Sequence, residues 1–225
     1  MADTYEVEVK SLLGSSENAD ALRAKLTTLD STCVCTNSYT QLNHYFEGGT
    51  IASLQTALAP LLSDETNEKL LRIAEEGHHT SVRSRETSGE VRVVVKASLG
   101  SDSSANGVTR IEIEEVVPLT FAELDERILS AGFTYQAKWS RSREEYQLGN
   151  VAVCLDKNAG YGYVAEFERV VEDTAQLTKA REDIEALMKA LEVTELPQDR
   201  LERMFAHYNE HWAEYYGTDK IFVIN

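Results

Sequence analysis

Charged side chains recur at every second position in five short segments of this sequence. In the first segment, Glu6, Glu8 and Lys10 alternate with Val7 and Val9. Residues two apart in a β-strand point to the same side of a sheet, so this spacing predicts a strand with one charged face and one apolar face. The same spacing recurs in four further sets: Arg83 and Arg85; Arg110, Glu112 and Glu114; Arg141 and Arg143; and Glu166 and Glu168.

A charged strand face has two interpretations. It can be a solvated outer face, as in any half-exposed antiparallel sheet. It can also line the inside of a β-barrel whose apolar outer face packs on helices. An exposed face usually mixes Thr, Ser, Gln and Lys, whereas every position in these five sets is Glu, Arg or Lys. We therefore favour a barrel with a charged lumen, in which the charges must be paired or hold a ligand.

These side chains would suit a polyphosphate that carries a divalent cation. Carboxylates two residues apart can bind a hard cation such as Mg²⁺ through oxygen. Arginines on neighbouring strands can hold phosphate oxygens in a bidentate manner. The spacing alone shows only that these groups share faces. The sequence has no G-x-x-x-x-G-K-[ST] loop, no H-E-x-x-H motif and no nucleophile elbow, which would indicate other chemistry.

Strands and helices are both expected along the chain. Period-two and β-rich segments predict strands at 5–13, 33–47, 80–98 (a hairpin that turns at Ser88-Gly89), 109–117, 134–147, 150–156 and 163–170. Apolar stripes and caps predict helices at 17–30, 50–75 (two short helices), 120–131, 173–192 and 198–216. Strand pairs close in sequence favour antiparallel pairing. We expect a single domain over residues 1–225, of class α+β, with an eight-stranded antiparallel β-barrel and helices packed outside.

The composition limits the classes of function. The 225 residues include 22 Lys and Arg against 38 Asp and Glu, a formal net charge of −16. Such an acidic protein is not expected to bind bulk nucleic acid, so a polyanion must enter a local basic site. No apolar run approaches the roughly 20 residues that span a bilayer. The N-terminus lacks a signal-peptide pattern. We expect a cytoplasmic protein with no membrane partner.

Cysteine and histidine residues give weak signals. The odd number of cysteines argues against a disulfide scaffold. Cys33 and Cys35 form a C-x-C pair, and Cys154 lies far away. We read His44 and the pair His78-His79 as solvated residues rather than metal ligands.

The charged sets belong to an ordered series of motifs. They are E-x-E-x-K (Glu6 to Lys10), Q-x-N-x-Y-F (Gln41 to Phe46), R-x-R (Arg83 to Arg85, with Lys96 after the hairpin), R-x-E-x-E (Arg110 to Glu114), R-x-R-x-x-Y (Arg141 to Tyr146) and L-D…G-x-G-x-x-x-E-x-E (Leu155 to Glu168). The series resembles the CYTH family of triphosphate tunnel metalloenzymes, which contains class IV adenylate cyclases, thiamine triphosphatases and inorganic triphosphatases. Asn43 stands where that family commonly has Asp, and Arg141 where it has Lys.

The resemblance implies a role for each charged residue in a tunnel-shaped barrel. It implies triphosphate binding by Lys10, Arg83, Arg85, Lys96, Arg110, Arg141 and Arg143. It implies Mg²⁺ or Mn²⁺ binding by Glu6, Glu8, Asp156, Glu166 and Glu168. It implies catalytic roles for Glu6, Glu8, Lys10, Glu112 and Glu114.

The function expected from the resemblance is metal-dependent hydrolysis of an inorganic, nucleoside or organic triphosphate. One alternative is a class IV adenylate cyclase, which makes cyclic AMP and pyrophosphate from ATP. A second alternative is a non-catalytic module that binds a polyphosphate. Two segments depart from the compact members of the family: a helical insertion at about 50–78 and a helical C-terminal extension at about 195–225. Either segment could form a lid, a contact in a homodimer or a specificity element.

Overall fold

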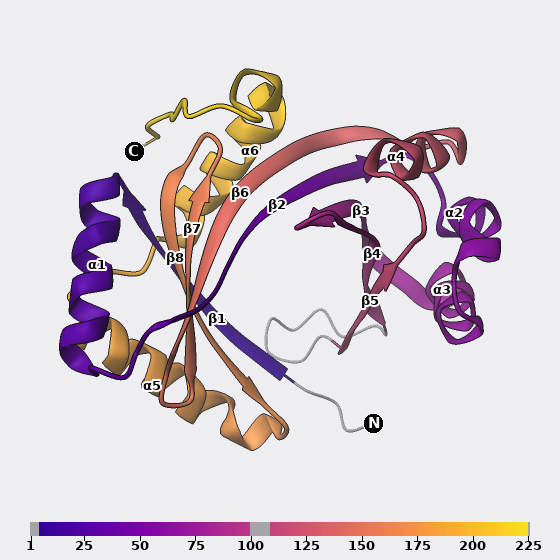
Figure 1. Cartoon of the computed structure of the whole chain (residues 1–225). Coiled ribbons are helices and arrows are strands. Elements are labelled where there is room, and N and C mark those ends of the chain that lie inside the picture. Colours follow the sequence, from indigo (N-terminus) through magenta and orange to yellow (C-terminus); the bar gives the residue numbers. More distant parts are fainter. Residues whose placement is uncertain (1–4, 100–108, 225) are drawn as a thin grey trace. The chain divides into compact units, whose positions relative to one another are not determined.

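A computed structural model describes residues 5–99 and 109–224 of the chain. The fold is α+β, as the sequence predicts (Figure 1). The strands are β1 (Tyr5–Gly14), β2 (Cys35–Glu47), β3 (Gly77–Thr87), β4 (Glu90–Leu99), β5 (Thr109–Val116), β6 (Thr134–Leu148), β7 (Val151–Asn158) and β8 (Gly162–Val171). The α-helices are α1 (Ser16–Leu29), α2 (Ile51–Leu58), α3 (Asp64–Glu76), α4 (Phe121–Ser130), α5 (Leu177–Ala190) and α6 (Gln198–Tyr215). Short 3₁₀ helices are η1 (Ala59–Leu61) and η2 (Thr174–Gln176). Residues 100–108, whose Gly, Ser, Asp and Asn content predicts a polar loop, lie outside the described residues.

The eight strands form one antiparallel sheet in the order β1-β8-β7-β6-β2-β3-β4-β5. This confirms the predicted eight-stranded antiparallel sheet. The order leaves β1 and β5 at its two ends, and no hydrogen-bonded ladder joins these strands in the described residues. Closure of the sheet into a tunnel stays a prediction.

Two compact units divide the chain. We call them the terminal unit (residues 1–40 and 140–225) and the central unit (residues 41–139). Strands β2 and β6 each contribute residues to both units. Each unit has its own apolar core. The organisation of residues 1–225 as a single domain stays a prediction.

Helices α1 and α5 cover one face of the strands in the terminal unit (Figure 1). Val9 of β1 and Phe167 of β8 point into this core, where they meet Leu22 and Leu26 of α1 and Ile184 of α5. The apolar positions of the alternating strands are therefore buried under helices. The charged side chains occupy every second position of the same strands, so they face the other side of the sheet.

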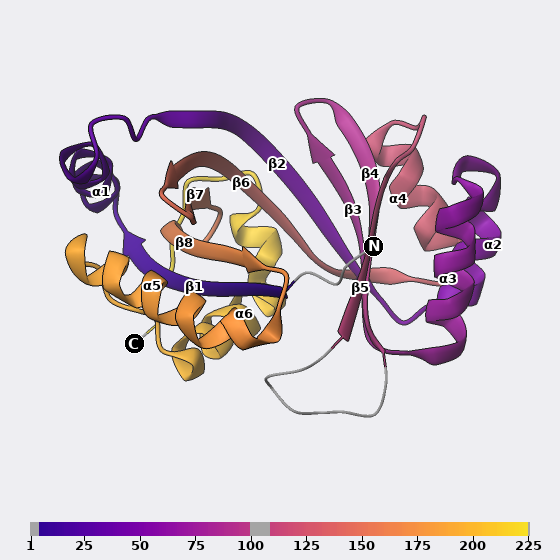
Figure 2. The ribbon, with the colours of Figure 1, turned by 90° about the horizontal axis from the view of Figure 1, so that it is seen from below.

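The central unit repeats this arrangement with a different set of helices. Its core packs the strand residues Val93, Val95 and Ile113 against α2, α3 and α4, which Figure 2 shows together on one side of β3, β4 and β5. The fully buried side chains Leu54 and Leu70 come from the predicted insertion at 50–78. The insertion therefore forms a layer of the core.

Local sequence signals fix most element boundaries. The Ser63 side chain caps α3 by accepting from the backbone N–H of Thr66. Thr120 and Glu123 form the predicted capping box of α4. Helix α5 begins at Leu177 rather than 173, because Asp173 caps the 3₁₀ turn η2 instead. Strand β3 begins at Gly77 rather than at residue 80, so it also contains His78.

The C-terminal extension packs within the terminal unit. The ring of Tyr208 on α6 is fully buried and lies 5.9 Å from the ring of Tyr161 in the β7–β8 turn. Beyond α6, the backbone N–H groups of Gly160 and Phe222 each donate to a carbonyl of the other segment. Within the described residues, the tail forms an isolated parallel bridge between Gly160 and Ile221. Within residues 5–99 and 109–224, no helix combines the length and apolar character needed to cross a bilayer.

Gly162→Ala should destabilise the terminal unit. Gly162 has a positive φ of +72°, and a Cβ there would collide with the backbone oxygen of Gly14. The cost should exceed the about 1–2 kcal/mol of left-handed backbone alone. Gly149 is a matched control, because its φ is +59° and a Cβ there meets nothing within 4 Å. Urea unfolding of the two alanine variants measures the difference. Equal losses of stability would contradict the close approach of Gly162 and Gly14.

Candidate charged site

The terminal unit carries a charged face on the side of its sheet away from α1 and α5. The register pairs Glu8 with Glu168, and Lys10 with Glu166. Lys10 forms ion pairs with Glu8 and with Glu166, the latter at 3.1 Å. Two of the predicted carboxylates, Glu8 and Glu166, therefore contact one ammonium group, and Glu168 lies opposite Glu8 on β8. We call the residues Glu8, Lys10, Arg141, Arg143, Asp156, Glu166 and Glu168 the terminal face.

Two arginines of β6 complete the terminal face. Arg143 donates to both carboxylate oxygens of Asp156, at 2.7 and 2.6 Å, and forms an ion pair with Glu166. Arg141 donates to the same carboxylate at 3.0 Å. The Asp156 side chain is 0% exposed. A buried carboxylate with two guanidinium partners fixes the direction of both arginines, so Asp156 acts as an anchor in this structure.

Protonation states on the terminal face follow from burial and charge. Burial works to lower the pKa of Lys10, but the attraction of Glu166 and Glu8 outweighs it and raises that pKa. Burial works to raise the pKa of Glu166, but Lys10, Arg143 and Arg141 hold it below its ordinary value. Burial raises the pKa of the Cys154 thiol to about 12. At neutral pH, Lys10 is a cation, Glu166 is an anion and Cys154 is not a thiolate nucleophile.

The carboxylates of the terminal face fit a hard divalent cation by donor type. Glu8, Glu166 and Glu168 offer only oxygen ligands, which Mg²⁺ and Mn²⁺ prefer. Within the described residues, no three His, Cys, Asp or Glu side chains converge on one point. Glu166 is instead engaged by Lys10 and Arg143. A cation that binds here would compete with Lys10 for Glu8, and with Lys10 and Arg143 for Glu166.

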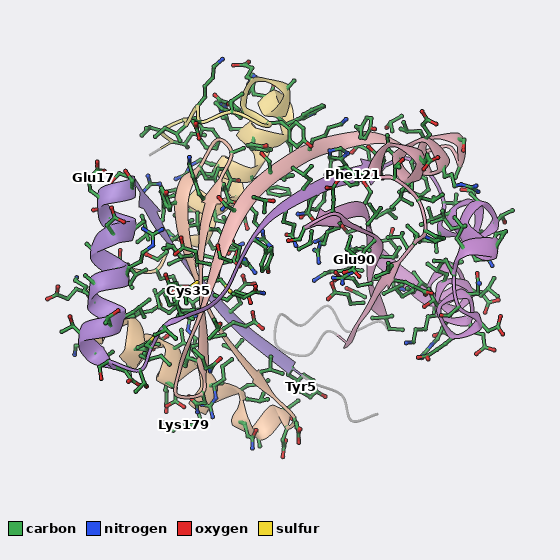
Figure 3. The ribbon with its side chains drawn as sticks, in the orientation of Figure 1. Tyr5, Glu17, Cys35, Glu90, Phe121 and Lys179 are labelled. Atoms are coloured by element: carbon green, nitrogen blue, oxygen red, sulfur yellow. The ribbon has the colours of Figure 1, made fainter. Side chains whose placement is uncertain are left out.

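The central unit carries a second charged face on β3, β4 and β5. Arg85 pairs with Glu114 at 2.8 Å, and Lys96 pairs with Glu112 at 2.9 Å. Asn43 of β2 accepts from Arg85 Nε at 2.9 Å, so the position where the family commonly has Asp supports an arginine here. We call Asn43, Tyr45, Arg83, Arg85, Arg92, Lys96, Glu112 and Glu114 the central face. Figure 3 labels Glu90, where β4 begins beside this face.

Arg83 differs from its neighbours on the central face. Its guanidinium lies 4.6 Å from the centre of the Tyr45 ring, and its Nε donates to Ser81 Oγ at 3.3 Å. In the described part of the chain, no carboxylate lies within ion-pair distance of Arg83. A half-buried cation stacked on an aromatic ring, without an anion beside it, has the capacity to bind an anionic ligand.

The structure places most predicted site residues on these two faces. In the terminal unit it brings together Glu8, Lys10, Arg141, Arg143, Asp156, Glu166 and Glu168. In the central unit it brings together Arg83, Arg85, Lys96, Glu112 and Glu114. The side chains of Glu6 and Arg110 lie outside the described residues. The backbone register sets Glu6 opposite Val170 and Arg110 opposite Ser98. The predicted roles of all these residues stay predictions.

Sequence reasoning missed three residues on these faces. Arg92 pairs in register with Arg85 and contacts Glu114 at 3.3 Å. Arg92 and Lys96 are four residues apart on one strand. This even spacing places them on the same face and could have identified Arg92 as a member of it. Glu145 and Tyr39 lie beside the terminal face, where the Tyr39 hydroxyl donates to the Glu145 carboxylate at 2.7 Å. That contact joins residues 106 apart in sequence, and no local pattern indicates it.

Residues 65–200 match the model of the CYTH domain. The chain belongs to the CYTH family. This match covers β3 to α5 and includes most residues of both charged faces. No curated protein sequence matches this CYTH protein.

Solved structures share the fold of this CYTH protein. The PH1819 protein of Pyrococcus horikoshii has a TM-score of 0.59 at 19% identity, over 90% of this chain and 99% of that one. The PH1012 protein of the same organism has a TM-score of 0.57 at 18% identity, over 84% and 92%. A candidate adenylate cyclase from Vibrio parahaemolyticus has a TM-score of 0.56 at 15% identity, over 90% and 98%. At these identities the likeness concerns the fold alone.

Glu166→Gln should change how stability depends on pH. Because the folded pKa of Glu166 lies below its ordinary value of 4.5, its charge stabilises the fold above that pH and the contribution is lost as pH falls through the folded pKa. The amide should lower stability at pH 7 by about 1–3 kcal/mol and flatten the decline below pH 5. Denaturant unfolding from pH 3 to 8 measures both effects.

Glu182→Gln is the control for this series. Glu182 is an exposed residue of α5, and its amide should leave the pH dependence unchanged. A Glu166→Gln protein with the same acid decline as the parent would show that the Lys10–Glu166–Arg143 network contributes no net stability.

Proposed function

We propose that this CYTH protein hydrolyses a triphosphate with the help of Mg²⁺ or Mn²⁺. The observation that carries the proposal is Arg83, a cation on the central face that has no carboxylate partner among the described residues. Arg85 and Lys96, on the same face, have only partly buried partners that a phosphate could displace. Membership of the CYTH family supports a triphosphate as the anion.

The basic residues would bind the three phosphates. Guanidinium groups present a planar fork that matches phosphate oxygens, and the ammonium groups act as point charges. The residues assigned to this role are Lys10, Arg83, Arg85, Lys96, Arg110, Arg141 and Arg143. Asp156 would keep Arg141 and Arg143 directed toward the ligand by holding them from the buried side. This pre-orientation lowers the ordering cost of binding.

The carboxylates would hold the cation and orient water. Glu6, Glu8, Glu166 and Glu168 are the proposed ligands, while Asp156 keeps its two arginines in place. When bound, such a cation polarises a phosphoryl oxygen and offsets developing charge. Glu112 or Glu114 would orient the attacking water by accepting its hydrogen bond. Lys10 remains protonated near Glu166 and would stabilise charge on the phosphate oxygens.

A class IV adenylate cyclase is the second candidate, and Tyr45 is the observation that favours it. Its ring lies on the central face beneath Arg83 and could stack against a nucleobase. Cyclisation needs the ribose 3′-oxygen held about 3–3.5 Å from the α-phosphorus, which requires specific contacts to base and ribose. Hydrolysis needs only the phosphate-binding residues, a cation and water. We therefore place hydrolysis first.

Triphosphate should raise the melting temperature of the protein, because it binds only the folded state. At a ligand concentration of about 100 times Kd the added stability is about 2.7 kcal/mol. Arg83→Ala and Arg143→Ala should each remove most of this shift, measured by differential scanning fluorimetry. Arg169→Ala is the matched control, since the register places Arg169 opposite Val7, on the other side of the sheet from the terminal face. Full shifts in both test variants would show that the charged faces do not bind the phosphates.

The products should identify the reaction. With Mg²⁺ or Mn²⁺, we expect inorganic triphosphate to be cleaved to phosphate and pyrophosphate faster than ATP is consumed. Anion-exchange separation of phosphate, pyrophosphate and cyclic AMP measures both reactions in one assay. Glu8→Gln should fold normally and lose turnover, because it removes a ligand charge without removing apolar packing.

Two other outcomes would replace this proposal. Cyclic AMP and pyrophosphate as the main products from ATP, with triphosphate acting only as an inhibitor, would establish the cyclase. A triphosphate-induced rise in melting temperature without turnover of either substrate would indicate a binding module.

A further inference from the structure

A buried carboxylate ties three strands of the central unit to α4. Asp125 of α4 lies 2.6 Å from His44 Nδ1 on β2 and accepts at 2.7 Å from the Tyr135 hydroxyl on β6. Its other oxygen accepts from the hydroxyl of Ser84 on β3. An ionised carboxylate only accepts, so all three partners donate. We call Asp125, His44, Ser84 and Tyr135 the Asp125 cluster.

The cluster is sealed from solvent on the apolar side of the sheet. The side chains of Asp125 and His44 are each 7% exposed, and Ser84 is 0% exposed. The His44 ring lies 4.3 Å from the ring of Phe121, which Figure 3 labels at the start of α4. Burial works to raise the pKa of Asp125, but the hydrogen bonds from His44, Ser84 and Tyr135 hold it below its ordinary value. The expectation that His44 is solvated is therefore wrong.

Two of the three strand residues of the cluster, His44 and Ser84, each lie between two residues of the central face. His44 follows Asn43 and precedes Tyr45, while Ser84 lies between Arg83 and Arg85. The register pairs His44 with Ser84 and, one step along, Asn43 with Arg85. Because successive side chains point to opposite faces, His44 and Ser84 contact Asp125 on one side of the sheet. Their neighbours Asn43, Tyr45, Arg83 and Arg85 project from the other side.

A buried charge is a costly way to join a helix to a sheet, since apolar residues of similar volume often serve as well or better. The hydrogen bonds, however, fix direction and register in a manner that apolar contacts do not. The cluster uses them on the two strands that carry Arg83, which has no carboxylate partner among the described residues, and the Asn43–Arg85 hydrogen bond. A role in orientation explains why a charge is placed here.

We propose that Asp125 is a positioning residue for the anion-binding arginines of the central face. By accepting hydrogen bonds from Ser84 and His44, it fixes the position of β3 relative to β2. It thereby sets the direction in which Arg83 and Arg85 point. This inference rests on the proposed function, because it takes a triphosphate as the ligand of those arginines. It predicts that loss of the Asp125 hydrogen bonds affects substrate binding more than turnover of bound substrate.

The test compares Asp125→Asn, Ser84→Ala and Ser84→Thr with the parent protein. Asp125→Asn and Ser84→Ala should each raise the KM for inorganic triphosphate about tenfold and leave kcat within about twofold. Ser84→Thr keeps the hydroxyl and should return KM toward the parent value. Ile128→Val in the core of the same helix is the control. It should lower the melting temperature without changing KM.

A second measurement does not depend on catalysis. An arginine-selective dicarbonyl reagent, followed by mass spectrometry, reports the reaction rates of Arg83 and Arg85 in each folded variant. Asp125→Asn and Ser84→Ala should change these rates, whereas Ile128→Val should not. If Asp125→Asn fails to fold, Ser84→Ala decides the outcome.

The outcomes separate this inference from the proposed function. A parent protein that binds triphosphate, with unchanged KM and labelling in both cluster variants, overturns the inference and leaves the function standing. A parent protein that neither binds nor cleaves triphosphate overturns the function. The labelling rates then decide the inference: unchanged rates overturn it, and altered rates support positioning of the arginines for another anion.

Discussion

The two-residue period of the β-strand is the constraint on which this molecule depends. A strand that alternates Glu, Lys or Arg with Val, Ile or Phe cannot turn its two sides independently. Because α1 and α5 cover Val9 and Phe167, the charged side chains of β1 and β8 must point to the opposite side of the sheet. The same holds for β3 to β5 beneath α2, α3 and α4. Hydrophobic burial, the largest favourable term in folding, thus places the charged groups on one side of the sheet without requiring attraction among them.

Bringing like-charged groups together creates a second requirement, which is charge balance. The terminal face meets it internally, because Lys10 and Arg143 share Glu166, and Arg141 and Arg143 share Asp156. The central face meets it only in part, because Arg83 has no carboxylate partner in the described residues. On the central face, an anion would gain most beside Arg83, where the charge balance is incomplete.

Local patterns predicted much of the fold and little of its long-range chemistry. Alternation located the charged strands, and the capping residues Ser63 and Thr120 located helix starts, because these signals act within a few residues. The start of α5 was misplaced because the Asp173 cap serves a 3₁₀ turn and not the helix. The Asp125 cluster was not predictable, since it joins His44 to a residue 81 positions away and its members carry no shared pattern. Which residues share a face was readable from sequence. Which ion pairs form across strands required the register.

The three cysteines have a practical consequence for spectroscopy. Cys33 is buried, and Cys154 is buried with its pKa raised to about 12, so neither thiol is a ready nucleophile. Cys35, at the start of β2, is exposed. A maleimide fluorophore or a nitroxide spin label should therefore attach to the native chain at this one position without mutagenesis. A probe at Cys35 would report on β2, one of the two strands that contribute residues to both units.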